Sequence, residues 1–129
     1  MKAVNKLLSV ADIYINDPFC AISVDGKTIK DVYKGYVSSF GAMVIQNGLS
    51  AALAINMKTD GEGKERIKII EAIARMLSPK YRSIINAETL LNYSCENENN
   101  RLLKEDVINC SIALKLMMRT YQFNRVDNQ

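Results

Sequence analysis

Residues 101–123 read RLLKEDVINCSIALKLMMRTYQF, and this stretch decides the fold class. Its apolar side chains recur in steps of four and three residues, at Leu103, Val107, Cys110, Leu114, Met117 and Tyr121. Such steps place side chains along one side of an α-helix. We therefore expect a long final helix over residues 101–123 that buries this stripe, including Cys110, in the core.

The apolar residues before this stretch follow the same helical spacing. They predict further helices over residues 4–15, 28–47, 49–57, 64–77 and 86–93. Asp17-Pro18 should end the first helix, because a residue before proline avoids the α region. Gly48 should end the second helix and allow the chain to reverse into the third.

The second predicted helix carries several specific signals. Thr28, followed three residues later by Asp31, resembles a capping box, so the helix is expected to begin there. Gly41 and Ala42 have little side-chain bulk and would let another helix approach closely. The expected buried stripe consists of Tyr33, Val37, Phe40 and Val44.

Two segments are less regular. Residues 19–29 contain Asp25-Gly26, a pair that suits a tight turn, and predict a small hairpin or an ordered loop. Residues 78–85 open on Ser78-Pro79 and predict a short turn or helix. With 129 residues and no other strand signal, we expect an all-α fold: one helical domain over residues 1–129, a compact bundle of about five to seven helices.

The chain contains no histidine. This absence excludes nucleophiles activated by histidine and zinc sites that use histidine ligands. Cys20, Cys95 and Cys110 are far apart and form no CxxC pair, so we expect free thiols in a reducing cytoplasm. No stretch reaches the roughly 18 apolar residues of a membrane span.

Two motifs suggest chemistry but have simpler interpretations. Residues 26–28 read Gly-Lys-Thr, like the end of a phosphate-binding loop, but Ala21 stands where its first glycine belongs. Paired acids that can hold Mg²⁺ or act as acid and base occur at Glu96 and Glu98 and at Glu105 and Asp106. Acids near the start of a helix also favour its dipole. We therefore expect a turn at residues 26–28, no catalytic residue, and no metal or cofactor.

The positions of the basic residues say more about function than their number does. There are 17 Lys and Arg against 14 Asp and Glu, a mild excess. By helical spacing, Lys64, Lys68 and Arg75 share one side of the fourth helix. One side of the final helix carries Lys104, Ser111, Lys115, Arg119 and Gln122. Such stripes are either solvated faces or, if they converge, contacts to the phosphates of RNA or DNA.

Residues 36–55, YVSSFGAMVIQNGLSAALAI, carry a family resemblance. They resemble the small helical subunit of the type III-B CRISPR RNA-guided effector, the Cmr complex. In that family a tyrosine-bearing helix ends in Asn-Gly-Leu and a short Ala/Leu-rich helix follows, as in residues 46–49 and 51–54 here. Residues 112–123 resemble the family's last helix, with Arg119 where arginine is usual and Leu116 near a position that is often Trp.

The resemblance implies a non-catalytic subunit in antiviral defence. Copies of such a subunit stack head-to-tail in the effector and line the groove that holds guide and target RNA, while neighbouring subunits cut. Its partners would be the other subunits, the RNA backbones and further copies of itself. The candidate RNA-binding residues are Lys64, Lys68, Arg75, Lys115 and Arg119.

Two other functions remain open at this point. The first is a small helical adaptor or regulatory protein that binds a protein partner without RNA. The second is an Mg²⁺-dependent enzyme built on the paired acids Glu105 and Asp106.

Overall fold

The computed structural model describes residues 2–58, 60–61 and 63–124. Within them the chain forms six helices and two short strands. In order these are α1 (Lys2–Ile15), β1 (Thr28–Lys30), α2 (Val32–Asn47), α3 (Leu49–Ile55), α4 (Gly63–Leu77), α5 (Ala87–Glu96), α6 (Arg101–Met118) and β2 (Gln122–Asn124). The predicted all-α fold with five to seven helices is confirmed.

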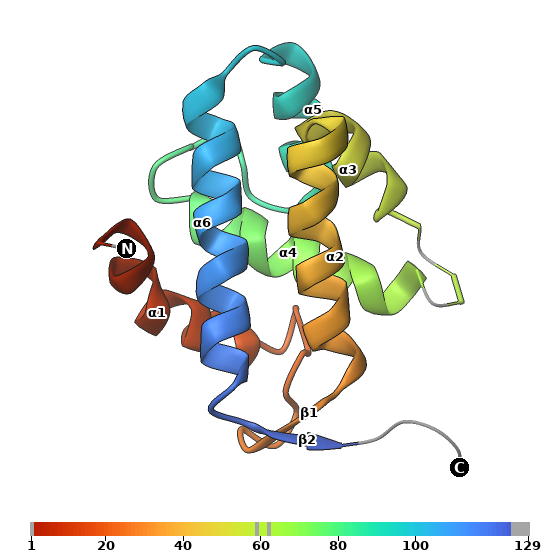
Figure 1. Cartoon of the computed structure of the whole chain (residues 1–129), viewed down its shortest axis with the longest axis vertical. Helices are drawn as coiled ribbons and strands as arrows, with labels where there is room; N and C mark the ends of the chain where they lie inside the picture. The colour runs from red at the N-terminus through yellow and green to blue at the C-terminus, as the bar shows by residue number, and fades with distance from the viewer. Residues whose placement is uncertain (1, 59, 62, 125–129) are drawn as a thin grey trace.

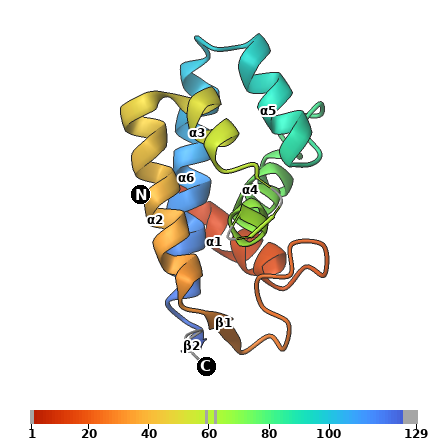
Figure 2. The same ribbon diagram turned by 90° about the vertical axis from the view of Figure 1, so that its right-hand side faces the viewer.

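The helices surround one apolar cluster, to which all six contribute. Helices α2 and α6 run antiparallel at the front, and α4 crosses behind both (Figure 1). Helix α1 packs against α6 and α4, whereas α3 and α5 close the opposite end of the bundle from the two strands. Turning the molecule by 90° separates these layers and shows α5 beside α4 (Figure 2).

The α2–α3 junction lies at Gly48, as predicted, but Gly48 does not adopt the left-handed α conformation that is expected of a glycine ending a helix. All four residues of the predicted stripe on α2, Tyr33, Val37, Phe40 and Val44, are buried. Gly48 follows α2 with a φ of 90° and a ψ of 162°, and its N–H donates to the carbonyl oxygen of Val44. This backbone region is almost confined to glycine, so Gly48 ends the helix for a steric reason.

We expect Gly48→Ala to lower the free energy of unfolding by about 1–2 kcal/mol, because a Cβ strains this backbone conformation. Gly35→Ala is the matched control. Gly35 lies inside α2 with open space where a Cβ would stand, so alanine there is expected to stabilise the protein by up to about 1 kcal/mol. Urea denaturation of both variants measures the contrast, and equal effects of the two substitutions would contradict it.

Residues 19–29 form an ordered loop, so the hairpin alternative is wrong. After the turn at Asp25, β1 pairs in parallel with β2 at the other end of the chain, with Ile29 opposite Phe123. The expected cap at Thr28 is also wrong. Its hydroxyl donates to Oδ2 of Asp25 at 2.9 Å, and α2 begins only at Val32.

The final helix is shorter than predicted. Its stripe is buried from Leu103 to Leu114, but α6 ends at Met118, and the following residues turn into β2 instead of continuing to residue 123. The turn is held by Tyr121, whose hydroxyl donates to Asp12 at 2.5 Å and accepts from Asn16 at 2.7 Å. These partners lie on or beside α1, so local spacing did not reveal them.

The other predicted segments can be compared with the structure one by one. Helices α1, α3 and α4 lie where expected, and α5 begins with a capping box at Asn86. Residues 78–85 form turns and no helix. Residues 59 and 62, between α3 and α4, lie outside the described part of the chain.

Candidate nucleic-acid interface

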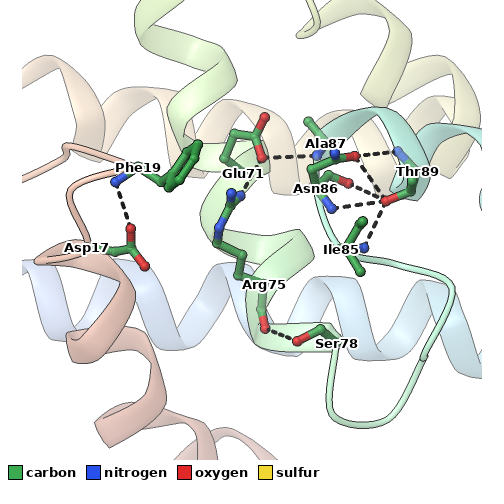
Figure 3. A network of polar contacts seen from close by, with 9 residues as sticks. All are labelled: Asp17, Phe19, Glu71, Arg75, Ser78, Ile85, Asn86, Ala87 and Thr89. Carbon is green, nitrogen blue, oxygen red and sulfur yellow. Dashed lines mark hydrogen bonds and ion pairs between the residues drawn. The ribbon is translucent and has the colours of Figure 1, made fainter.

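Arg75, one of the predicted RNA contacts, is held within the protein. Its guanidinium donates to Oε1 of Glu71 at 2.6 Å and lies 4.9 Å from the ring centroid of Phe19. The same Glu71 oxygen accepts from the N–H of Ala87 at the start of α5 (Figure 3). Arg75 therefore joins α4 to the loop after α1 and to α5, and its charge is balanced by Glu71.

Lys68 is also engaged with a neighbouring acid. Its ammonium lies 3.0 Å from Glu65, which further accepts hydrogen bonds from Lys30 and from Tyr33. Burial raises the pKa of Glu65, but these three donors lower it more, to about 2. Lys64, the first residue of the predicted stripe, is exposed. Of the three predicted contacts on α4, only Lys64 is thus exposed and without an ion pair to another described residue.

Lys115 on α6 and Arg119, which directly follows that helix, have a different environment. Lys115 is partly buried and Arg119 is exposed, and neither is ion-paired within the part of the chain that the structure describes. Residues 107–124 contain no acid. The positive charge of this segment is therefore not neutralised by its own sequence.

The crossing of α2 and α6 locates these two cations. A Cβ on Gly41 would stand 3.6 Å from Oγ of Ser111, so the helices meet closely there, as the small residues of α2 predicted. Gly48 follows Gly41 by seven residues, and Lys104 precedes Ser111 by seven. These two residues line the same pocket. This second contact confirms the antiparallel register. Lys115 follows Ser111 by one turn of α6 and thus borders α2 on the β2 side of the crossing.

The predicted residues therefore do not form one cluster. Arg75 contacts the loop at Phe19, Lys68 faces β1 through Glu65, and Lys115 borders α2. Sequence spacing also missed Lys34, whose ammonium lies 5.6 Å from the ring centroid of Phe123, near the end of α6. A signal was present, because residues 32–58 contain no acid.

The motifs that suggested other chemistry are occupied by structural contacts. Asp25 accepts from the backbone N–H groups of Lys27 and Thr28 at 2.9 and 2.8 Å, and these bonds lower its pKa to about 2. The carboxylate thus takes the amides that a phosphate would need. Asp106 accepts from Tyr81 and pairs with Lys80 at 3.0 Å.

The cysteines and the metal-ligating side chains of the described residues also have no arrangement typical of a reactive site. The three cysteines are unpaired, and burial raises the pKa of Cys20 and of Cys110 to about 12, so both are thiols near neutral pH. Among the described residues no group of three or more Cys, Asp or Glu side chains is placed to hold a metal ion. None of the helices in these residues is long and apolar enough to cross a membrane.

Comparison with known proteins identifies the family. A family model described as CRISPR-associated protein (Cas_Cmr5) matches residues 20–117, about three quarters of the chain. Neither the curated proteins nor the solved structures give a significant match. The matched span includes the Asn-Gly junction at Gly48 and nearly all of α6. The chain belongs to the Cas_Cmr5 family and is a CRISPR-associated subunit of the Cmr type.

Proposed function

We propose that this protein is the non-catalytic small subunit of a type III-B CRISPR effector and that it holds the RNA backbone along α6. The observation that carries the proposal is the pair Lys115 and Arg119, which project from a helix segment without acids beside α2. Lysine and arginine contacts to phosphates fix the position of a nucleic acid without reading its bases. Such contacts suit a subunit that must accept any guide sequence.

The other predicted contacts are revised within this proposal. Lys64 is exposed and stays in the RNA-binding set. Lys68 and Arg75 are already paired with Glu65 and Glu71, so we assign them to the stability of the fold. We further propose that copies of the chain stack head-to-tail beside the other effector subunits in the cytoplasm, as in the family it resembles.

The contacts of Asp106 and the burial of two cysteines support a non-catalytic role. Asp106 already binds two side chains, and the pKa values of Cys20 and Cys110 make both thiols poor nucleophiles. RNA cleavage by the assembled effector should therefore be assigned to other subunits. Mg²⁺-dependent cleavage that is lost with Glu105→Gln and Asp106→Asn would contradict this assignment.

The charge reversals Lys115→Glu and Arg119→Glu test the proposal together. We expect the double variant to fold normally and to weaken RNA retention by the assembled effector at least about tenfold, most strongly at low salt. Lys2→Glu with Lys6→Glu is the matched control, because these exposed lysines of α1 carry the same charge change. Unchanged retention over a salt titration would remove Lys115 and Arg119 from the site.

A native pull-down from the source cell separates this function from that of an adaptor. An effector subunit should bring down several CRISPR-associated proteins together with RNA. A single protein partner that remains bound after nuclease treatment would instead favour the adaptor. The exposed apolar side chains that such an adaptor could use are Phe19 and Val24 in the loop before β1, Ile85 before α5, and Ile13, Ile45, Ile55 and Leu102 on four different helices.

A further inference from the structure

We propose that Lys34 is a further RNA-phosphate contact, which forms a basic cluster of three with Lys115 and Arg119, and that Phe123 of β2 positions it. This inference rests on the proposed function and extends it to a second helix and to the C-terminal strand. The ligand is the sugar-phosphate backbone of one RNA strand, which lies across the end of the α2–α6 pair next to the two strands.

The helix register brings the three cations to the same end of the bundle. Lys34 precedes Gly41 by seven residues, and Met118 follows Ser111 by seven. At 1.5 Å per residue, each lies about 10.5 Å from the helix crossing and in the same direction. Lys34 on α2 is therefore level with the last turn of α6, where Arg119 follows directly.

The spacing on each helix also sets the side on which these residues lie. Residues seven apart lie on nearly the same side of a helix, so Lys34 borders α6 as Gly41 does. On α6, Lys115 is four residues beyond Ser111 and so borders α2, and Arg119 follows one turn later, directly after the helix ends. The three cations thus lie along the line where α2 and α6 face each other.

Strand β2 holds Lys34 in this position. The carbonyl oxygen of Asn124 accepts from the N–H of Asp31 at 3.0 Å, directly before α2. Pairing of β2 with β1 places Phe123 opposite Ile29, and the Lys34 ammonium lies 5.6 Å from the Phe123 ring centroid. A cation above an aromatic face is attracted to it but stays hydrated and able to meet an anion.

The charge around the cluster favours an anion. Residues 32–58, which include α2, and residues 107–124, which include most of α6, contain no Asp or Glu. The nearest acid along the chain is Asp31, one turn before Lys34. Three cations carried by segments without acids attract a polyanion and release its counterions on binding. A protein partner would need a matching acidic patch, whereas RNA supplies regularly spaced phosphates.

Lys34→Gln and Phe123→Leu, tested in the reconstituted effector, separate the two roles. Removing the Lys34 charge should weaken RNA binding about three- to fivefold and make the slope of log K against log salt shallower by about 0.7 for single-stranded RNA. Phe123→Leu keeps every charge, so it should weaken binding about twofold with an unchanged slope. Lys34→Arg should restore both affinity and slope. Lys6→Gln, a neutralisation on α1, should change neither.

The outcomes distinguish this inference from the proposed function. If the Lys115 and Arg119 reversals weaken RNA retention while Lys34→Gln leaves the slope unchanged, Lys34 is outside the site and the inference fails alone. If none of the three residues affects RNA binding, the proposed function fails as well. Loss of effector assembly with Lys34→Gln, at unchanged RNA affinity, would assign this cluster to a protein contact and overturn the inference.

Discussion

Replacing Phe40 with alanine is expected to lower the free energy of unfolding by about 3–5 kcal/mol. The Phe40 ring is 1% exposed and lies in the middle of the buried stripe of α2, next to the close contact between Gly41 and Ser111. Alanine would remove most of the apolar side chain and leave a cavity that rigid neighbouring helices cannot fill. A loss of this size is a large part of the stability of a typical domain. Urea denaturation followed by circular dichroism measures it.

Phe19 provides the matched control for the same chemical change. Its ring is 81% exposed and contacts the Arg75 guanidinium on one face. Phe19→Ala should therefore cost no more than about 1 kcal/mol, the value of an exposed cation–π contact. A similar loss from both variants would mean that the core does not lie on the α2 stripe.

Phe40 and Gly48 show which parts of the fold could be predicted from the sequence. The α2 stripe follows from spacing within one helix, and the end of α2 follows from the backbone conformation that Gly48 alone tolerates. Both signals lie within a few residues of the structure that they specify. Local signals of this kind also place α1, α3, α4 and α5.

The strands and the end of α6 could not be predicted in this way. The spacing of Met117 and Tyr121 continues the helical pattern, but Tyr121 is bound by Asp12, more than 100 residues earlier in the chain. Thr28 has the sequence of a cap, yet it pairs with Gln122 in the parallel sheet. Tertiary contacts between distant segments override local preference at such positions, particularly in short strands.

The candidate site shows the same limit. Spacing placed Lys115 and Arg119 along one side of the final helical segment, because that placement depends only on the helix period. It also selected Arg75, whose partner Glu71 lies on the same helix and whose ring partner Phe19 comes from a distant loop. Whether a cation is free or paired depends on packing between elements. For that reason the sequence alone located helix faces better than binding residues.

Glu65 is the residue whose loss should most affect the ionic contacts of the fold. It accepts hydrogen bonds from Tyr33 at 2.7 Å and from Lys30, and pairs with Lys68 at 3.0 Å. Glu65→Gln removes the charge and adds a donor facing these three donors. We expect a loss of about 2–3 kcal/mol near neutral pH, which comes chiefly from Tyr33 and Lys68. Lys30 is 45% exposed, and an ion pair so exposed contributes little.

The pH dependence of stability separates this charge effect from a packing effect. The pKa of Glu65 is about 2 in the folded protein and takes its ordinary value of 4.5 in the unfolded chain. A lowered pKa stabilises the fold fully above pH 4.5, and the contribution is lost as the pH falls toward 2. The stability gap between the wild-type protein and Glu65→Gln should therefore narrow over this range. Glu98→Gln, a neutralisation at an exposed position between α5 and α6, should change stability by less than about 0.5 kcal/mol at any of these pH values. A gap at Glu65 that stays constant with pH would show that the substitution acts through shape, because a lost charge must titrate.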